Sequence, residues 1–190
     1  KVRHLRSDEF LLIVGAGGVG LAGIGMAKAV VKAKIIVAEI DPAKRAAALE
    51  AGAEVVLDNS ETSAREELIS LTNGGPNAAI DFVGAPATVE FAFGVMAKGA
   101  SLVLVGLYGG AAQLSTSLFP LKVNNILGSF VGTQQDLVEL LQLFREGKVK
   151  PVPMVRRPLR EAPQAIQELR EGRALGRYVS VSYTHLTLPT

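Results

Sequence analysis

The sequence predicts an α/β fold: a doubly wound sheet of six parallel strands, followed by a short C-terminal extension. Three observations lead to this fold class. Apolar runs rich in β-branched residues alternate along the chain with stretches of helical length. The runs are continuously apolar, which is typical of parallel strands that helices cover on both faces. Glycines 52, 99 and 147 stand where three of the helical stretches should end.

The elements follow one another in a regular order. We expect strands at residues 10–14, 34–39, 54–57, 78–82, 101–105 and 126–131, and helices at 19–31, 42–51, 63–71, 87–97 and 135–145. Asp41 before Pro42 is a strong helix-start signal. After the sixth strand, we expect an extended connection over residues 148–160, a helix over 162–171 and a short strand over 177–179.

Composition limits the possible functions. The 190 residues, 48% apolar and 20% charged, suit one globular domain. A net charge of +2 gives no reason to expect nucleic acid or a membrane surface as a partner. The uncharged window 10–27 has the minimum length of a membrane span, but six of its residues are glycine, so we expect no span. The absence of cysteine excludes disulfides and thiolate metal sites within this chain, and a cytoplasmic location fits it.

A glycine motif follows the first strand directly. Gly15 allows a tight turn, Gly17 leaves room for a pyrophosphate, and Gly20 allows the next helix to pack closely on the sheet. The start of that helix offers free N–H donors to phosphate groups. Glu39 ends the second strand nineteen residues after Gly20, and its carboxylate can accept hydrogen bonds from the hydroxyls of an adenosine ribose. Together these features predict a dinucleotide site.

With these motifs and several later ones, the chain resembles the medium-chain dehydrogenase/reductase superfamily, in its zinc-type alcohol dehydrogenase branch. The resemblance covers roughly residues 8–179 and is carried by VGAGGVGL, AEIDPAKR, AALEAGAEVVLD, AIDFVGA, GASLVLVGL, GSFVGT and GRALGRYV. It implies a Rossmann fold that binds NAD over residues 10–179. Residues 1–9 would then be a linker from an N-terminal catalytic domain.

The resemblance also implies a set of cofactor-binding residues. A turn of glycines would bind the pyrophosphate, with Val19 near the nicotinamide and Arg177 paired with the phosphates; the glycines are Gly15, Gly17, Gly18 and Gly20. Glu39 would bind the adenosine ribose, and Lys44 would lie beside the ribose hydroxyls. Phe82 and Val83 would flank the two riboses. Backbone groups of Val105, Ser129 and Val131 would contact the nicotinamide carboxamide.

The function implied is hydride transfer between an alcohol or carbonyl substrate and NAD in the parent enzyme. The charge of Glu39 would repel the 2′-phosphate of NADP, although Arg45 nearby could weaken that preference. Zinc would be bound by the N-terminal domain, so this chain alone would bind the dinucleotide without turnover. Two alternatives stay open at this point: a zinc-free quinone or enoyl reductase of the same superfamily, and a non-catalytic NAD-sensing module.

Three further expectations concern single segments. Lys32 stands where the family commonly has glycine, so the first helix should end without a left-handed cap. Residues 111–118 resemble the edge through which family members join their sheets, so we expect a homo-oligomer. Residues 180–190 match no element of the fold and resemble a translated sequencing adapter, so we expect a non-native tail there.

Overall fold

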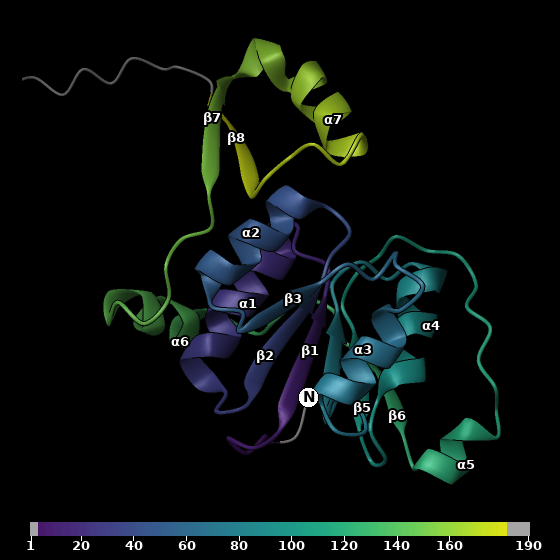
Figure 1. Ribbon diagram of the computed structural model, residues 1–190. Coiled ribbons are helices and arrows are strands. Elements are labelled where there is room, and N and C mark those ends of the chain that lie inside the picture. Colours follow the sequence, from purple (N-terminus) through teal and green to yellow (C-terminus); the bar gives the residue numbers. More distant parts are fainter. Residues whose placement is uncertain (1–3, 182–190) are drawn as a thin grey trace, which may run out of the picture.

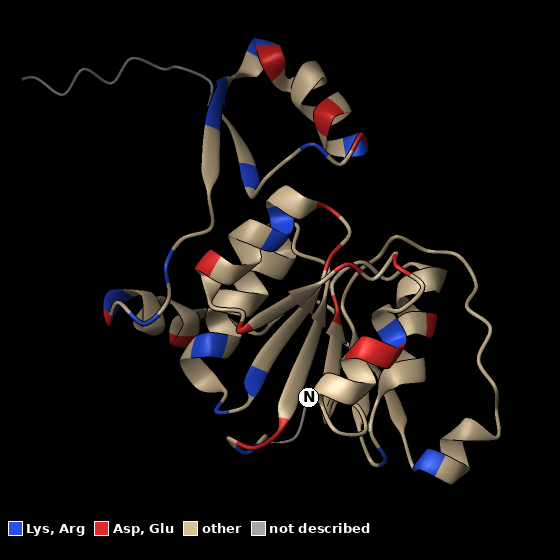
Figure 2. Cartoon of the chain, viewed as in Figure 1, with Lys and Arg blue, Asp and Glu red and all other residues tan. Residues whose placement is uncertain are grey.

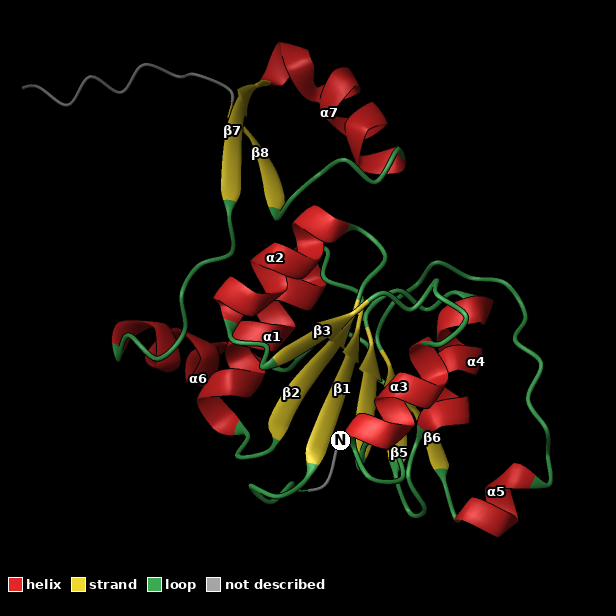
Figure 3. Cartoon of the chain, in the orientation of Figure 1, coloured by secondary structure: helices red, strands yellow, loops and turns green. Residues whose placement is uncertain are grey.

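The structure is a computed structural model that describes residues 4–181. Its centre is a parallel sheet of six strands in the order β3-β2-β1-β4-β5-β6. The strands are β1 (Phe10–Val14), β2 (Lys34–Ala38), β3 (Val55–Leu57), β4 (Ala78–Asp81), β5 (Ser101–Leu104) and β6 (Asn125–Gly128). This order is typical of a doubly wound sheet (Figure 3): β2 and β3 lie on one side of β1, and β4, β5 and β6 lie on the other.

Helices cover both faces of the sheet, as the continuously apolar strands predicted (Figure 1). Helices α1 (Gly18–Val30) and α2 (Pro42–Ala51) lie on one face, and α3 (Ala64–Leu71) and α4 (Pro86–Val95) on the other. Alternate residues of β1 enter the two cores: Leu11 and Ile13 pack with α1 and α2, whereas Leu12 and Val14 pack toward α3 and α4. All four side chains are almost completely buried.

The helix ends follow the local signals. Asp41 caps α2, because its Oδ1 accepts hydrogen bonds from the N–H groups of Ala43 and Lys44. Helix α2 ends at Gly52, whose φ of +118° suits glycine. Helix α1 ends instead in extended backbone at Val31, with φ −108°. The prediction of an end without a left-handed cap is therefore confirmed.

The end of the chain holds more regular structure than we expected. Residues predicted as an extended connection contain β7 (Met154–Pro158), which pairs in parallel with β8 (Arg177–Val181). Between these strands lie the 3₁₀ turn η1 (Leu159–Glu161) and helix α7 (Ala162–Arg170). The prolines nearby indicated a loop, but Pro158 is the last residue of β7, where proline is tolerated. Strand β8 continues two residues beyond its predicted end, and residues 182–190 of the proposed tail lie outside the described part.

Two other segments differ from expectation. The structure adds a short helix, α5 (Leu118–Lys122), before β6. Strand β6 ends at Gly128, three residues before its predicted end, and Val131 adopts φ +47°, which no strand residue can adopt. Helix α6 (Gln134–Arg145) then follows, with its first turn closed by a capping box between Thr133 and Asp136.

Charge is concentrated away from the sheet interior. In Figure 2 the six strands are mostly tan, and acidic segments gather where β2, β3 and β4 end. In the sequence, Glu39, Asp58 and Asp81 stand at or directly after the carboxyl ends of β2, β3 and β4. Within residues 4–181, no helix is both long enough and apolar enough to cross a membrane.

Candidate dinucleotide-binding site

The predicted site residues gather at the carboxyl edge of the sheet. Five of them are the first residues after their strands; these are Gly15, Glu39, Phe82, Val105 and Ser129. The N–H group of each of these residues donates one more backbone hydrogen bond to the neighbouring strand. The Phe82 N–H, for example, donates to the Val14 carbonyl at 2.9 Å. Because β1 and β4 are neighbours at the point where the strand order reverses, a crevice opens at their carboxyl ends, where ligands bind in sheets of this kind.

The three motif glycines of this turn differ in backbone conformation and in the space around them. Gly15 adopts φ +89°, which favours glycine. A Cβ placed on Gly20 would lie 2.0 Å from the Gly15 carbonyl oxygen, so any side chain there would disrupt the turn. A Cβ on Gly17 would meet no described atom within 4 Å, so the turn faces open space at this point.

The N-terminus of α1 has the features of an anion-binding site. Among the described residues, no side chain caps this helix, and its first turn holds no acidic residue. The N–H groups of this turn therefore keep their donor capacity, and the helix dipole places partial positive charge there. Open space at Gly17 and uncapped donors behind it together fit the pyrophosphate of a dinucleotide.

Glu39 lies beside this turn and is only 8% exposed. Its Oε2 accepts a hydrogen bond from the Ala16 N–H at 2.7 Å, and its Oε1 accepts one from the Asp41 N–H at 3.0 Å. Two backbone amides thus hold the carboxylate in a single orientation. An ionised carboxylate has about four acceptor positions, so two remain for a ligand.

A cavity of about 620 Å³ joins these groups. Ten of the thirteen predicted residues line it: Gly15, Gly17, Gly18, Val19, Gly20, Glu39, Lys44, Phe82, Val83 and Arg177. A second hollow of about 460 Å³ lies between α1, α2 and residues 147–153, and none of the predicted residues lines it. The larger cavity is therefore the candidate site.

Three predicted residues lie at the same edge but do not line this cavity. Val105 and Ser129 follow β5 and β6, and Val131 is 80% exposed. A β-branched residue at φ +47° stores strain of about 1–3 kcal/mol, and such strain is common at functional sites.

The C-terminal unit β7-α7-β8 covers one side of the glycine turn. A Cβ on Gly18 would lie 2.5 Å from the Gly176 carbonyl oxygen and 2.8 Å from Arg177 Nε, so the two segments are in close contact. The Arg177 N–H donates to the Pro153 carbonyl at 2.8 Å, which ties the start of β8 to the residue before β7. The exposed guanidinium of Arg177 forms no ion pair with a carboxylate of residues 4–181 and is available to a phosphate.

Sequence reasoning missed several residues that line the cavity. These are Ile40, Asp41, Asn59, Thr88, Tyr108, Leu169, Glu171 and Gly172, together with Val14 and Ala38 at the strand ends. Asn59 had a usable signal, because it closely follows the end of β3. Leu169, Glu171 and Gly172 had none, since only the fold of the C-terminal unit brings them to the glycine turn.

Thr88 reaches the cavity through a buried carboxylate. Asp81, which is fully buried, accepts hydrogen bonds from the N–H groups of Val83 and Gly84 and from the Thr88 hydroxyl at 2.8 Å. These bonds fix the turn that places Phe82 and Val83 opposite the glycines. Asp81 is thus a structural support of the cavity wall.

Metal-binding groups are not gathered in the part of the chain that the structure describes. No three histidine, aspartate or glutamate side chains among residues 4–181 lie close enough together to hold a metal ion. The residues from 4 to 181 therefore do not fit a resident metal centre.

Known proteins resemble this chain in sequence and in structure. Residues 18–146 match the family described as zinc-binding dehydrogenase. The NAD-dependent alcohol dehydrogenases of Sulfurisphaera tokodaii and Saccharolobus solfataricus are 36% and 35% identical over 179 residues, which are 93% of this chain and 52% of each relative. The crystal structure of the alcohol dehydrogenase from Aeropyrum pernix superposes with a TM-score of 0.90 at 31% identity, over 95% of this chain and 52% of that chain.

These matches agree with the site geometry. The chain spans about half the length of the curated relatives it matches. The family match covers the glycine turn from Gly18 onward and continues through β6 and α6. The resemblance inferred from the motifs is therefore confirmed: the chain belongs to the zinc-binding dehydrogenase family and represents its nucleotide-binding half.

Proposed function

We propose that this chain binds NAD in the cavity at the carboxyl edge of the sheet. The observation that carries this proposal is the pair of backbone hydrogen bonds that orient the Glu39 carboxylate. Its two remaining acceptor positions match the 2′- and 3′-hydroxyls of an adenosine ribose in number and kind. Lys44, from the first turn of α2, lines the cavity beside it.

The geometry of the turn supports positions for the remaining parts of the cofactor. We assign the pyrophosphate to the N–H groups at the start of α1, with the guanidinium of Arg177 on its outer side. Phe82 and Val83 then form the wall opposite the glycines, and Val19 lies toward the nicotinamide end. Val105, Ser129 and Val131 would contact the carboxamide through backbone groups at the ends of β5 and β6.

Glu39 also favours NAD over NADP. A 2′-phosphate would replace a hydroxyl donor with negative charge beside a carboxylate, and the low exposure of Glu39 limits screening of that repulsion. The names of the relatives, which include NAD-dependent alcohol dehydrogenases, point in the same direction.

For the whole protein, we propose hydride transfer between an alcohol or carbonyl compound and NAD. NAD, when bound, supplies the hydride acceptor, and this chain binds and orients it. The family description supports a zinc ion in the parent enzyme, with its ligands outside the described residues. The names of the relatives favour this function over a quinone reductase or a non-catalytic sensor.

The remaining predictions concern assembly and location. Strand β6 is an edge of the sheet, and its Leu127 is 37% exposed, which supports pairing between copies and hence a homo-oligomer. Sedimentation of the chain would show a dimer or larger species if this is correct. A cytoplasmic location stays a prediction.

The experiment is an NADH titration of this chain followed by fluorescence. We expect saturable binding by the wild type and an affinity roughly ten- to a hundredfold weaker in Glu39→Gln, because a charged acceptor of two hydroxyls is lost. Glu54→Gln is the control: it removes a carboxylate that precedes β3 and pairs with Lys28, away from the cavity. Failure of the wild type to bind NADH, or equal binding by Glu39→Gln, would overturn the proposal.

A further inference from the structure

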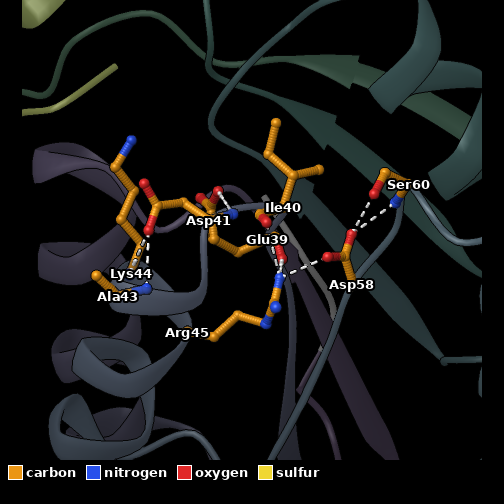
Figure 4. Close-up of polar contacts among 8 residues, drawn as sticks. All are labelled: Glu39, Ile40, Asp41, Ala43, Lys44, Arg45, Asp58 and Ser60. Carbon is orange, nitrogen blue, oxygen red and sulfur yellow. Dashed lines mark hydrogen bonds and ion pairs between the residues drawn. The ribbon is translucent and has the colours of Figure 1, made fainter.

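Arg45 is next in sequence to Lys44, yet it does not line the cavity. Its Nη1 donates hydrogen bonds to the carbonyl oxygens of Glu39 at 2.7 Å and Ile40 at 2.8 Å, and to Asp58 Oδ2 at 2.8 Å (Figure 4). A terminal guanidinium nitrogen has two N–H bonds, so at least one of them is shared. The guanidinium therefore links the segment after β2 to the segment after β3.

Asp58 completes this link from the other side. It is the first residue after β3, and its Oδ1 accepts hydrogen bonds from the Ser60 N–H at 2.9 Å and the Ser60 hydroxyl at 2.5 Å. The Ser60 bonds, followed by the Arg45 charge, hold the pKa of the Asp58 carboxyl below its usual value. Asp58 is therefore ionised at neutral pH. The side chains of Arg45 and Asp58 are 22% and 23% exposed, so water screens the pair only in part.

The pair lies directly behind the ribose end of the cavity. Three residues that line the cavity are connected to the pair. The carbonyl oxygens of Glu39 and Ile40 accept hydrogen bonds from Arg45, and Asn59 follows Asp58 in the chain. Glu39 and Asp41 already place negative charge at this end, where Lys44 also lines the cavity. The binding of a 2′-phosphate here would require additional positive charge, and Arg45 is the nearby group whose charge is already paired.

We propose that Asp58 determines cofactor selectivity by holding Arg45 outside the cavity, so that the site favours a cofactor with a free 2′-hydroxyl over one with a 2′-phosphate. This inference rests on the proposed function, because it concerns the same ribose site. Asp58 does not contact the cofactor in this account. It is a positioning residue that acts through Arg45.

Two substitutions should change selectivity in opposite directions. Asp58→Asn keeps an acceptor for Ser60 but removes the charge that holds Arg45, so we expect NADPH affinity relative to NADH to rise roughly three- to tenfold. Arg45→Gln leaves Asp58 uncompensated, so the same ratio should fall. The titrations use NADH and NADPH, with adenosine 5′-monophosphate and adenosine 2′,5′-bisphosphate as probes of the adenosine end alone.

The control is Glu54→Gln, which removes a carboxylate at the opposite end of β3 and should leave the ratio unchanged. Thermal melting of every variant separates selectivity from folding. A purely structural role would lower both affinities together and leave their ratio fixed. An unchanged ratio in Asp58→Asn, or a rise that persists in Asp58→Asn/Arg45→Gln, would overturn the inference even if the wild type binds NADH. Loss of NADH binding by the wild type would instead overturn the proposed function.

Discussion

Two glutamates in different parts of the molecule are equally buried but bonded in different ways. Glu39, at the end of β2, is 8% exposed and accepts two hydrogen bonds, both from backbone N–H groups. Glu168, in α7, is 7% exposed and accepts four, from Arg157, Gln164 and Tyr178. With about four acceptor positions per carboxylate, Glu168 is saturated by its own protein, whereas Glu39 retains capacity. Hydrogen-bond saturation thus distinguishes a structural carboxylate from one suited to a ligand.

The surroundings of the two regions agree with this difference. Arg157 pairs with Glu168 at 2.7 Å and also lies over the ring of Tyr178 at 4.5 Å, so charge, hydrogen bonds and ring contact all stabilise the C-terminal unit. A two-stranded sheet such as β7–β8 has little intrinsic stability, and this cluster compensates for it. At the glycine turn, the corresponding donors of α1 are left uncapped.

The largest effect on NADH binding is expected from substitutions in the glycine turn. Gly20→Val should abolish measurable NADH binding and lower Tm, because its Cβ would clash with the Gly15 carbonyl. Gly17→Ala is the matched variant: its Cβ meets no described atom, so Tm should stay within about 1–2 °C while NADH binding falls at least roughly tenfold. Titration and thermal melting of both variants measure this. Wild-type affinity in Gly17→Ala would show that the open space there is not the phosphate position.

A smaller effect is expected from the structural glutamate. Glu168→Gln removes the charge that pairs with Arg157 and replaces one accepting carboxylate oxygen with an amide NH2 donor. Tm should therefore fall by roughly 3 °C or more. NADH affinity should change less than about twofold, because Glu168 does not line the cavity. Glu39→Gln should weaken NADH binding far more than Glu168→Gln does, and it should also lower Tm, because its amide NH2 would face a backbone N–H that now donates to the carboxylate. If Glu168→Gln weakened NADH binding as much as Glu39→Gln does, the distinction based on saturation would be wrong.

The smallest effect is a pH dependence of the C-terminal unit. The hydrogen bond from the Tyr178 hydroxyl, followed by the bonds from Arg157, holds the pKa of Glu168 below its usual value. Because the folded pKa is depressed, this stabilisation is present above the unfolded pKa of about 4.3 and is lost as pH falls through the folded pKa. Tm measured from pH 7 down to pH 3 should therefore fall less steeply in Glu168→Gln than in the wild type. Parallel curves would contradict this assignment.

Much of the site was predictable because it depends on local sequence. The apolar runs that end in Gly15, Glu39 and Phe82 are parallel strands, and parallel strands place their carboxyl ends at one edge of a sheet. The position of each residue along its own strand was therefore enough to bring them together. The selectivity expected from Glu39 depends in the same way on its residue type and its place after β2.

Other parts of the site depend on contacts between distant segments. Nothing near Leu169 or Gly172 indicates that α7 approaches the glycine turn, because that approach depends on the pairing of β7 with β8. Arg45 could have faced the ribose or turned away from it; in the structure it donates to the carbonyls of Glu39 and Ile40 and to Asp58, thirteen residues along the chain. The sequence by itself determined the sheet, the glycine turn and the acid after β2, since strand period and backbone sterics act locally. Only the tertiary structure decided which charged side chains face the cavity and which are already paired, because that depends on packing between segments.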